Sequence, residues 1–148
     1  SVFNNGDVTD ASSKPLTWNL ASLENARSMF FNCTVFNQPL HFLNMNNMTE
    51  MADTLYGCDA FKQDISSWTV KACVDFTGFF AGDMNSPDST ANQDHYNAMH
   101  IAWAAQAPLQ PGVRLDMGTT RYSFAEAGTA RSILTSTYGW TINDGGAV

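Results

Sequence analysis

Apolar residues recur along the chain with a period of 25 residues. Trp18 is followed at this spacing by Leu43 and Trp68. The positions after this anchor repeat in the same register, and nearly all of them are apolar: Leu20, Met45 and Val70; Leu23, Met48 and Cys73; Ala26, Met51 and Phe76; Met29, Thr54 and Phe79; Phe30, Leu55 and Phe80. A fixed period in this range is typical of stacked supersecondary units that cannot bury their apolar faces alone. The sequence therefore predicts a repeat array.

Two kinds of spacing follow one another within each unit, and they are clearest after Asp64. Apolar residues alternate with Ser and Thr over residues 65–70, which predicts a short half-buried strand. Residues 73–80 carry apolar side chains at helical spacing, which predicts one or two helical turns. Asn32, Gly57 and Gly82 then stand where the backbone is expected to bend with positive φ.

The links between units also keep the 25-residue spacing. Phe36 and Phe61 are equivalent, as are Gln38 and Gln63. We expect the phenylalanines to stack in register, and the glutamines to satisfy backbone groups of a neighbouring unit, because buried polar groups need partners.

The regular pattern ends at residue 82. Residues 85–93 are rich in Ser, Pro, Asp and Asn and indicate a loop. Beyond it, the pattern predicts a helix around 96–103, a strand at 113–117, a helix at 124–134 and a strand at 140–142. We predict one α/β domain: a leucine-rich-repeat-like solenoid of short parallel strands and short helices over residues 1–82, with about three units, and a C-terminal α/β cap over residues 83–148.

The start of the chain repeats a later motif. Val2-Phe3-Asn4 is identical to Val35-Phe36-Asn37, as if the sequence began in the tail of an earlier repeat. An array cut at this point exposes core, so we expect a neighbouring repeat or subunit to cover the N-terminal end.

Composition and charge exclude several partners. The formal net charge is −7, and the seven basic residues are dispersed, whereas a nucleic-acid-binding surface needs clustered positive charge. No apolar run approaches the roughly 20 residues that span a membrane, so direct membrane insertion is not expected. A polar surface rich in Asn, Thr and Ser suits an extracellular setting.

The residues that could carry metal or redox chemistry do not form a known pattern. Cys33, Cys58 and Cys73 show no C-x-x-C spacing and no His at metal-ligand spacing. We interpret Cys33 and Cys58 as stacked core residues; the alternative, a disulfide, requires Cα atoms within about 7 Å. Calcium binding through Asp83, Asp88 and Asp144 is the weaker interpretation of these acids, because their spacing matches no calcium loop. We predict neither a metal site nor a cofactor.

Catalytic motifs are missing from the sequence. It has no G-x-S-x-G, G-x-G-x-x-G or P-loop pattern. Asp94-His95 and His100 lie near a predicted helix start, where polar residues usually cap or hydrate the helix. We therefore predict that the protein is not an enzyme.

Two sequence blocks carry a family resemblance. Residues 29–40 and 60–68 resemble the bacterial surface protein repeat of BspA-like and surface lipoprotein families. Residues 121–123, 129–131 and 140–146 resemble the same family. This repeat is related to leucine-rich repeats. The resemblance covers most of the chain and departs from the usual pattern at Leu43 and Thr54. It implies a protein exposed at a cell surface, secreted, or on a virion, and it carries over no catalytic residue.

Strand alternation supplies a candidate binding face. If the 25-residue anchors point inward, their neighbours point outward: Thr17, Asn19, Phe42, Asn44, Ser67 and Thr69. Phe42 would anchor a sugar ring or an apolar side chain, although the same residues could simply hydrate an exposed sheet. We predict a non-catalytic, surface-exposed recognition or adhesion module that binds protein or glycan at a cell or particle surface. The alternative is a structural or assembly subunit, such as a virion decoration, tail or fibre component.

Overall fold

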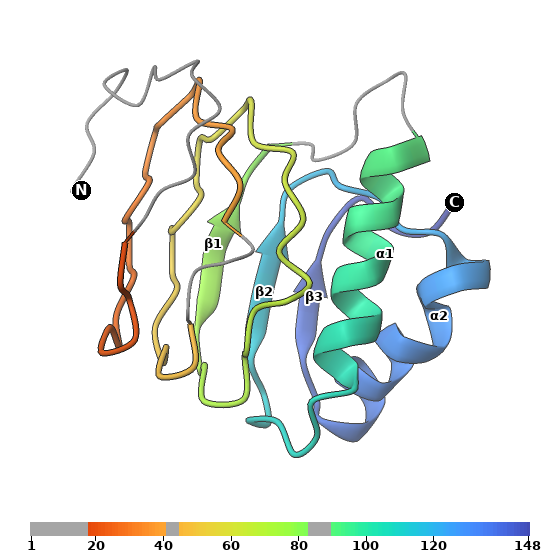
Figure 1. The fold of residues 1–148 in the computed structure, drawn as a ribbon. Coiled ribbons are helices and arrows are strands. Elements are labelled where there is room, and N and C mark those ends of the chain that lie inside the picture. Colours follow the sequence, from red (N-terminus) through yellow and green to blue (C-terminus); the bar gives the residue numbers. More distant parts are fainter. Residues whose placement is uncertain (1–17, 41–44, 83–89) are drawn as a thin grey trace.

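The fold is mixed α/β. The computed structural model describes residues 18–40, 45–82 and 90–148. Its elements are β1 (Phe76–Phe80), α1 (Thr90–Ala104), β2 (Arg114–Met117), α2 (Phe124–Ser132), a π-helical turn η1 (Ile133–Thr137) and β3 (Thr141–Asn143). The three strands form a parallel sheet in the order β1-β2-β3, and α1 runs along one face of it with α2 beside α1 (Figure 1).

The 25-residue units continue the parallel arrangement of the sheet beyond β1. Isolated parallel bridges join Asn25 to Glu50 and Glu50 to Asp75. The N–H of Ala26 donates to the carbonyl of Glu50 at 2.8 Å, and one unit later that of Met51 donates to Asp75 at 2.9 Å. In Figure 1 these segments lie side by side, next to β1 on the side away from β2. The period read from the sequence is therefore also a spatial period.

The backbone of each bridging segment alternates between two kinds of hydrogen bond. The N–H groups of Ser28 and Phe30 donate to the next unit, whereas that of Met29, between them, donates locally to the carbonyl of Ala26 at 3.0 Å. Ser28, with φ of 57°, adopts the left-handed conformation, as do its equivalents Asp53 and Gly78. These segments are consequently neither regular strands nor helices.

The predicted order of strand and helix within the unit is wrong. Residues 66–67 form a turn and 68–70 have no regular structure, whereas the segment predicted as helical contains strand β1. The local bonds span three residues, as from Met29 back to Ala26, so apolar side chains three and four apart return to the same face. This backbone therefore produces the i, i+3, i+4 spacing that usually indicates a helix.

The predicted core is confirmed for the described second and third units, whereas Trp18, Leu20 and Leu23 of the first unit are partly buried and Leu43 lies outside the described residues. Phe36 and Phe61 are fully buried and stack, with ring centroids 5.9 Å apart and planes 4° apart. Trp68 is buried, and its indole N–H donates to the carbonyl of Leu40 at 3.0 Å. Gln63 donates its amide to the backbone carbonyl of Asn37 in the preceding unit, as expected.

Thr54 occupies an apolar position of the repeat without leaving a polar group unpaired. Its side chain is fully buried, and its hydroxyl lies 2.7 Å from the carbonyl of Met51 and 3.0 Å from that of Ala26. The hydroxyl therefore satisfies backbone groups of its own unit and of the one before.

The C-terminal elements agree with the sequence pattern. Both predicted helices and both predicted strands are present, with bounds shifted by a few residues. The predicted loop at 85–93 is wrong for residues 90–93, which belong to α1, and its residues 85–89 lie outside the described part of the chain. Residue 83 also lies outside it, so the division into repeats and cap stays a prediction. Among the described residues, no helix has the length and apolar character needed to cross a membrane.

Candidate ligand-binding site on the outer sheet face

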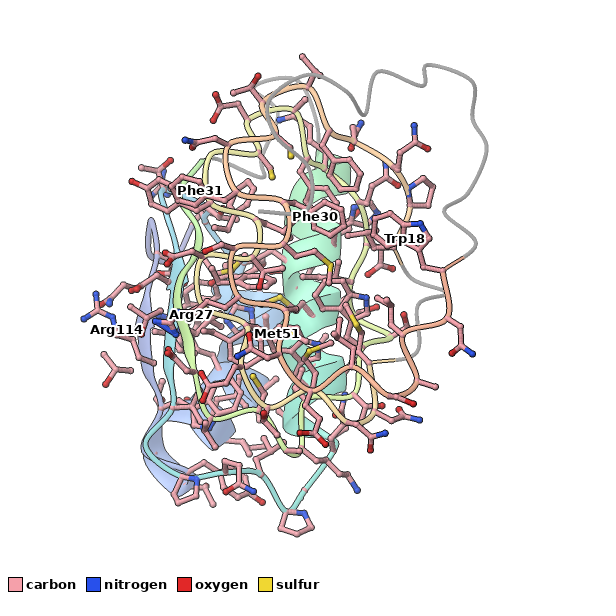
Figure 2. The ribbon with its side chains drawn as sticks, turned by 90° about the vertical axis from the view of Figure 1, so that its left-hand side faces the viewer. Trp18, Arg27, Phe30, Phe31, Met51 and Arg114 are labelled. Atoms are coloured by element: carbon pink, nitrogen blue, oxygen red, sulfur yellow. The ribbon has the colours of Figure 1, made fainter. Side chains whose placement is uncertain are left out.

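The sheet has an inner face that packs on the core and an outer face that is polar. Phe30 and Phe31 are neighbours in sequence but differ in position: Phe30 is fully buried, whereas Phe31 is only partly buried. Figure 2 shows Phe31, Arg27 and Arg114 along the side away from α1, with Phe30 and Met51 toward the interior. On the outer face, side chains of successive units therefore lie next to one another at the surface of the molecule.

An aromatic pair stands on this face. Phe31 and Tyr56 occupy equivalent positions of two units, and their rings stack with centroids 5.3 Å apart and planes 11° apart. The Tyr56 side chain keeps an exposure of 40%. The next equivalent position is Ala81, whose small side chain leaves space beside Tyr56.

A bulge forms where the repeats meet the C-terminal strands. Phe76 pairs with Leu115 and Phe80 with Met117, so four steps along β1 correspond to two along β2. Gly78 lies in the middle of the bulge with φ of 63°. A Cβ at Gly78 would lie 2.2 Å from the Asp53 carboxylate, so a larger residue would have to displace this side chain in addition to adopting a positive φ.

An open pocket with a volume of about 290 Å³ lies at this bulge. It is lined by residues of one repeat unit, of β1 and the residues after it, and of the two C-terminal strands: Tyr56, Gly78, Phe80, Ala81, Asp116, Gly118 and Asn143. The pocket thus combines an exposed aromatic ring, a carboxylate and a side-chain amide.

Asp116 is held by donors on three sides. The N–H of Gly78 donates to its Oδ2 at 2.8 Å, the amide of Asn143 to its Oδ1 at 2.6 Å, and Nε of Arg114 to its Oδ2 at 2.9 Å. Burial raises the pKa of Asp116, but these hydrogen bonds outweigh it and the pKa lies below its ordinary value. The carboxylate is therefore ionised and fixed in place at neutral pH.

A second group of charges lies on the outer face. Arg27 lies 3.4 Å from the carboxylate of Asp75 and 3.8 Å from that of Glu50. The Arg27 side chain is about half exposed, so these pairs contribute little to stability. One arginine faces two carboxylates, so the group is negatively charged overall.

The residues predicted as a binding face do not meet at this pocket. Thr17, Phe42 and Asn44 lie outside the described residues. Asn19 is exposed, and its side-chain oxygen accepts from the N–H of Ala21 at 3.1 Å. Thus half of the predicted set can be located in the structure.

Ser67 and Thr69 lie on the segment next to the end of α1. Ser67 is exposed in a turn, and Thr69 is half-buried. The side chain of Gln106 joins this segment to the region after α1, because it donates to the carbonyl of Trp68 and accepts from the N–H of Val70, both at 2.8 Å. The strand alternation from which the face was derived is not present here.

The pocket residues were missed because three of them, Asp116, Gly118 and Asn143, come from beyond the repeats. Asp116 and Asn143 pair across β2 and β3, and nothing in the 25-residue pattern points to them. Tyr56 could have been found, since Phe31 and Tyr56 are aromatic at equivalent positions directly after the buried repeat positions Phe30 and Leu55.

The three cysteines are buried in the core, and no disulfide joins them. Desolvation raises the pKa of Cys58 and of Cys73 to about 12, and it also raises that of Cys33. The Cys58 thiol donates to the carbonyl of Phe30 at 3.1 Å. These groups are poor nucleophiles and fill space between units.

A second polar cluster lies within the C-terminal part. Arg131 binds Asp144 at 2.5 Å, and the hydroxyl of Tyr96 donates to the same carboxylate at 2.7 Å. His100 is fully buried; its Nε2 lies 3.3 Å from Arg131 and its Nδ1 lies 2.9 Å from the carbonyl of Tyr96. Both ring nitrogens are engaged, so this histidine is not placed to exchange a proton with a ligand. The cluster ties α1, α2 and the segment after β3 together.

The candidate metal ligands do not cluster within the described part of the chain. Among the side chains that the structure describes, no group of three or more His, Cys, Asp or Glu could hold a metal ion. Two of the acids considered for calcium, Asp83 and Asp88, lie outside the described residues. The third, Asp144, is paired with Arg131.

Comparison with known proteins gives a family match. The family model described as "Mycoplasma protein of unknown function, DUF285" matches residues 1–110. No curated protein and no solved structure matches the chain.

Proposed function

We propose, from the premise that the chain belongs to the DUF285 family, that it is a non-catalytic recognition or adhesion module displayed at a cell or particle surface. In this proposal the 25-residue units form a leucine-rich-repeat-like solenoid of the BspA-like kind, and the outer sheet face is the binding face. Extracellular, cell-surface and virion-surface settings all fit such a module.

The observation that carries the proposal is the exposed aromatic pair beside the pocket. Tyr56 keeps 40% of its surface exposed although it stacks on Phe31. Tyrosines held in this way are typical anchors of recognition surfaces, because they bring a large contact area at a small cost in conformational entropy. Repeat proteins commonly bind across a surface made from equivalent positions.

Charge on the same face favours a protein or glycan partner over nucleic acid. Arg27 and Arg114 are the labelled cations of this face in Figure 2, and both are paired with carboxylates. A nucleic-acid backbone needs unpaired, clustered cations. The net charge of −7 works in the same direction.

The experiment is a binding assay of the purified chain against cell-envelope fractions and arrayed envelope proteins and glycans. Tyr56→Ala should reduce binding by about tenfold, as expected for loss of an aromatic anchor. Ile101→Ala is the matched control, because Ile101 is 49% exposed but lies on α1. Equal binding by Tyr56→Ala and the unmodified chain would reject the outer face as the binding face.

A structural or assembly subunit is the second candidate, favoured by apolar side chains on the helical side. Phe124 is 67% exposed at the start of α2, and Ile133 is also exposed. Such residues suit a fixed interface with another subunit. Stable oligomers or particles that Phe124→Ser dissolves would support this function, whereas a monomer whose envelope binding is unaffected by Phe124→Ser would exclude it.

A further inference from the structure

We propose that the pocket between Tyr56 and Asn143 binds one neutral pyranose ring of a glycan. The inference rests on the proposed recognition function and specifies its ligand. It follows from four features of the pocket: the aromatic surface, the arrangement of polar groups, the balance of charge and the size.

The aromatic surface suits the apolar face of a sugar. A pyranose ring presents C–H groups on one face, and these pack against an aromatic ring while the hydroxyl groups around the rim remain free for polar contacts. Tyr56 offers such a ring at the pocket wall, and its stacking on Phe31 limits the positions that the ring can adopt. Binding therefore costs little ordering of this side chain.

The polar groups suit the hydroxyl rim. An ionised carboxylate has about four acceptor positions, and the described donors to Asp116 are Gly78, Asn143 and Arg114, the last shared between both oxygens. Each carboxylate oxygen thus already accepts two contacts, so the polar group of the pocket that is left for a sugar hydroxyl is the amide of Asn143. Within the described part of the chain, the amide oxygen of Asn143 accepts no hydrogen bond, so it can accept from an adjacent hydroxyl.

The polar groups are also pre-organised. The Asn143 amide bonds Asp116 at 2.6 Å, and the Gly78 N–H fixes the second carboxylate oxygen at 2.8 Å. Groups that are already held in their binding positions lose less entropy when a ligand arrives. The bulge that creates the pocket therefore also orients its carboxylate.

The charge balance favours a neutral ligand. Arg114 lies 2.9 Å from Asp116, so the two charges at the pocket largely compensate each other. A carboxylated sugar would bring a second anion next to Asp116, and a cationic ligand would have to compete with Arg114. A neutral ring incurs neither penalty.

The size favours one ring of a longer chain. The volume of about 290 Å³ lies at the lower end of the range of roughly 300–1,000 Å³ for small-molecule sites. The pocket is open to the outer face, so further sugar units can extend along the sheet. Phe31 lies next to Tyr56 in that direction.

The test is an NMR titration of the whole, nitrogen-15-labelled chain, in which both ligand and backbone amide signals are followed, with methyl glycosides of glucose, galactose, mannose and N-acetylglucosamine. Glucuronic acid and lysine methyl ester are the charged probes. At least one neutral glycoside should bind with a dissociation constant in the millimolar range, and the amide signals of Gly78 and Gly118 should shift with it. Tyr56→Ala should weaken this binding about fivefold to tenfold, and Tyr56→Phe should restore it, because the ring is retained.

Three results would overturn the inference: no neutral glycoside binds, a charged probe binds more tightly than every neutral one, or Tyr56→Ala binds glycosides as well as the unmodified chain. Unchanged binding by Ile101→Ala, together with an unaltered unfolding midpoint for Tyr56→Ala, shows that the loss is local. If glycosides fail while Tyr56→Ala still loses envelope binding, the inference fails and the proposed function stands. If the variant also keeps its envelope binding, both fail.

Discussion

The described repeats, residues 18–40 and 45–82, and the C-terminal part, residues 90–148, fill their interiors differently. The repeats bury stacked aromatic rings such as Phe36 and Phe61, with no buried ion pair among their described residues. The C-terminal part buries Asp144, at 3% exposure, against Arg131 and Tyr96.

The two interiors differ because the two parts pack different kinds of elements together. Successive units present similar faces 25 residues apart, so equivalent apolar side chains meet and one register satisfies the whole stack. The C-terminal part joins elements of unequal length, and directional hydrogen bonds fix their positions there. The pocket lies where the repeats meet the C-terminal part. At this point β1 uses four residues to span the length that β2 spans with two.

The largest effect should come from interrupting the aromatic stack. Phe61→Ala removes a fully buried ring next to Phe36 and should lower the free energy of unfolding by about 3–5 kcal/mol. Urea denaturation measures the change. The control is Val74→Ala, because Val74 is exposed; its effect should be under about 0.5 kcal/mol. A Phe61→Ala loss no larger than this control would show that the stack does not support the repeats.

The polar interior should respond almost as strongly to the loss of one charge. Arg131→Met leaves the buried Asp144 carboxylate without its counterion and should cost about 3–4 kcal/mol of unfolding free energy. The double variant Arg131→Met with Asp144→Asn should recover part of this loss, since no uncompensated charge remains. If the double variant is as unstable as the single one, the ion pair is not the source of the effect.

Lowering the pH should destabilise the C-terminal part, because His100 is buried there. Burial, with a smaller contribution from the nearby charge of Arg131, lowers the pKa of His100 from 6.5 to about 4. The folded chain binds this proton less readily than the unfolded chain, so the stabilisation is complete above pH 6.5 and is lost as pH falls toward 4. The loss is about 3 kcal/mol. Urea denaturation should show His100→Gln losing less stability than the unmodified chain across this interval, and parallel curves would contradict the assignment.

A smaller effect is expected at the polar link between units. The side-chain oxygen of Asn37 accepts from the backbone N–H of Lys62 at 2.9 Å and from the amide of Gln63 at 3.0 Å. Asn37→Ala should cost about 1 kcal/mol. Val35→Ala, at an exposed apolar position of the same unit, should cost less in the same denaturation assay. A larger loss for Val35→Ala would contradict the role given to Asn37.

Sequence pattern predicted the spacing of the repeats and the C-terminal elements because both depend on apolar periodicity. It failed inside the unit because Ser28 and Asp53 adopt positive φ without being glycine, a conformation that residue type does not predict. Local three-residue turns then imitate helical spacing. The pocket was not predictable, because it depends on a register shift between β1 and β2; only the aromatic pair at Phe31 and Tyr56 was visible in the repeat.

The most direct test of the binding face is amide hydrogen exchange of the chain with and without a bound envelope fraction. Binding at the outer face predicts slower exchange in residues 53–57, 78–81 and 116–118, with little change in residues 66–70. Protection confined to residues 66–70, next to the end of α1, would contradict the assignment and return the binding site to the segment that carries Ser67 and Thr69.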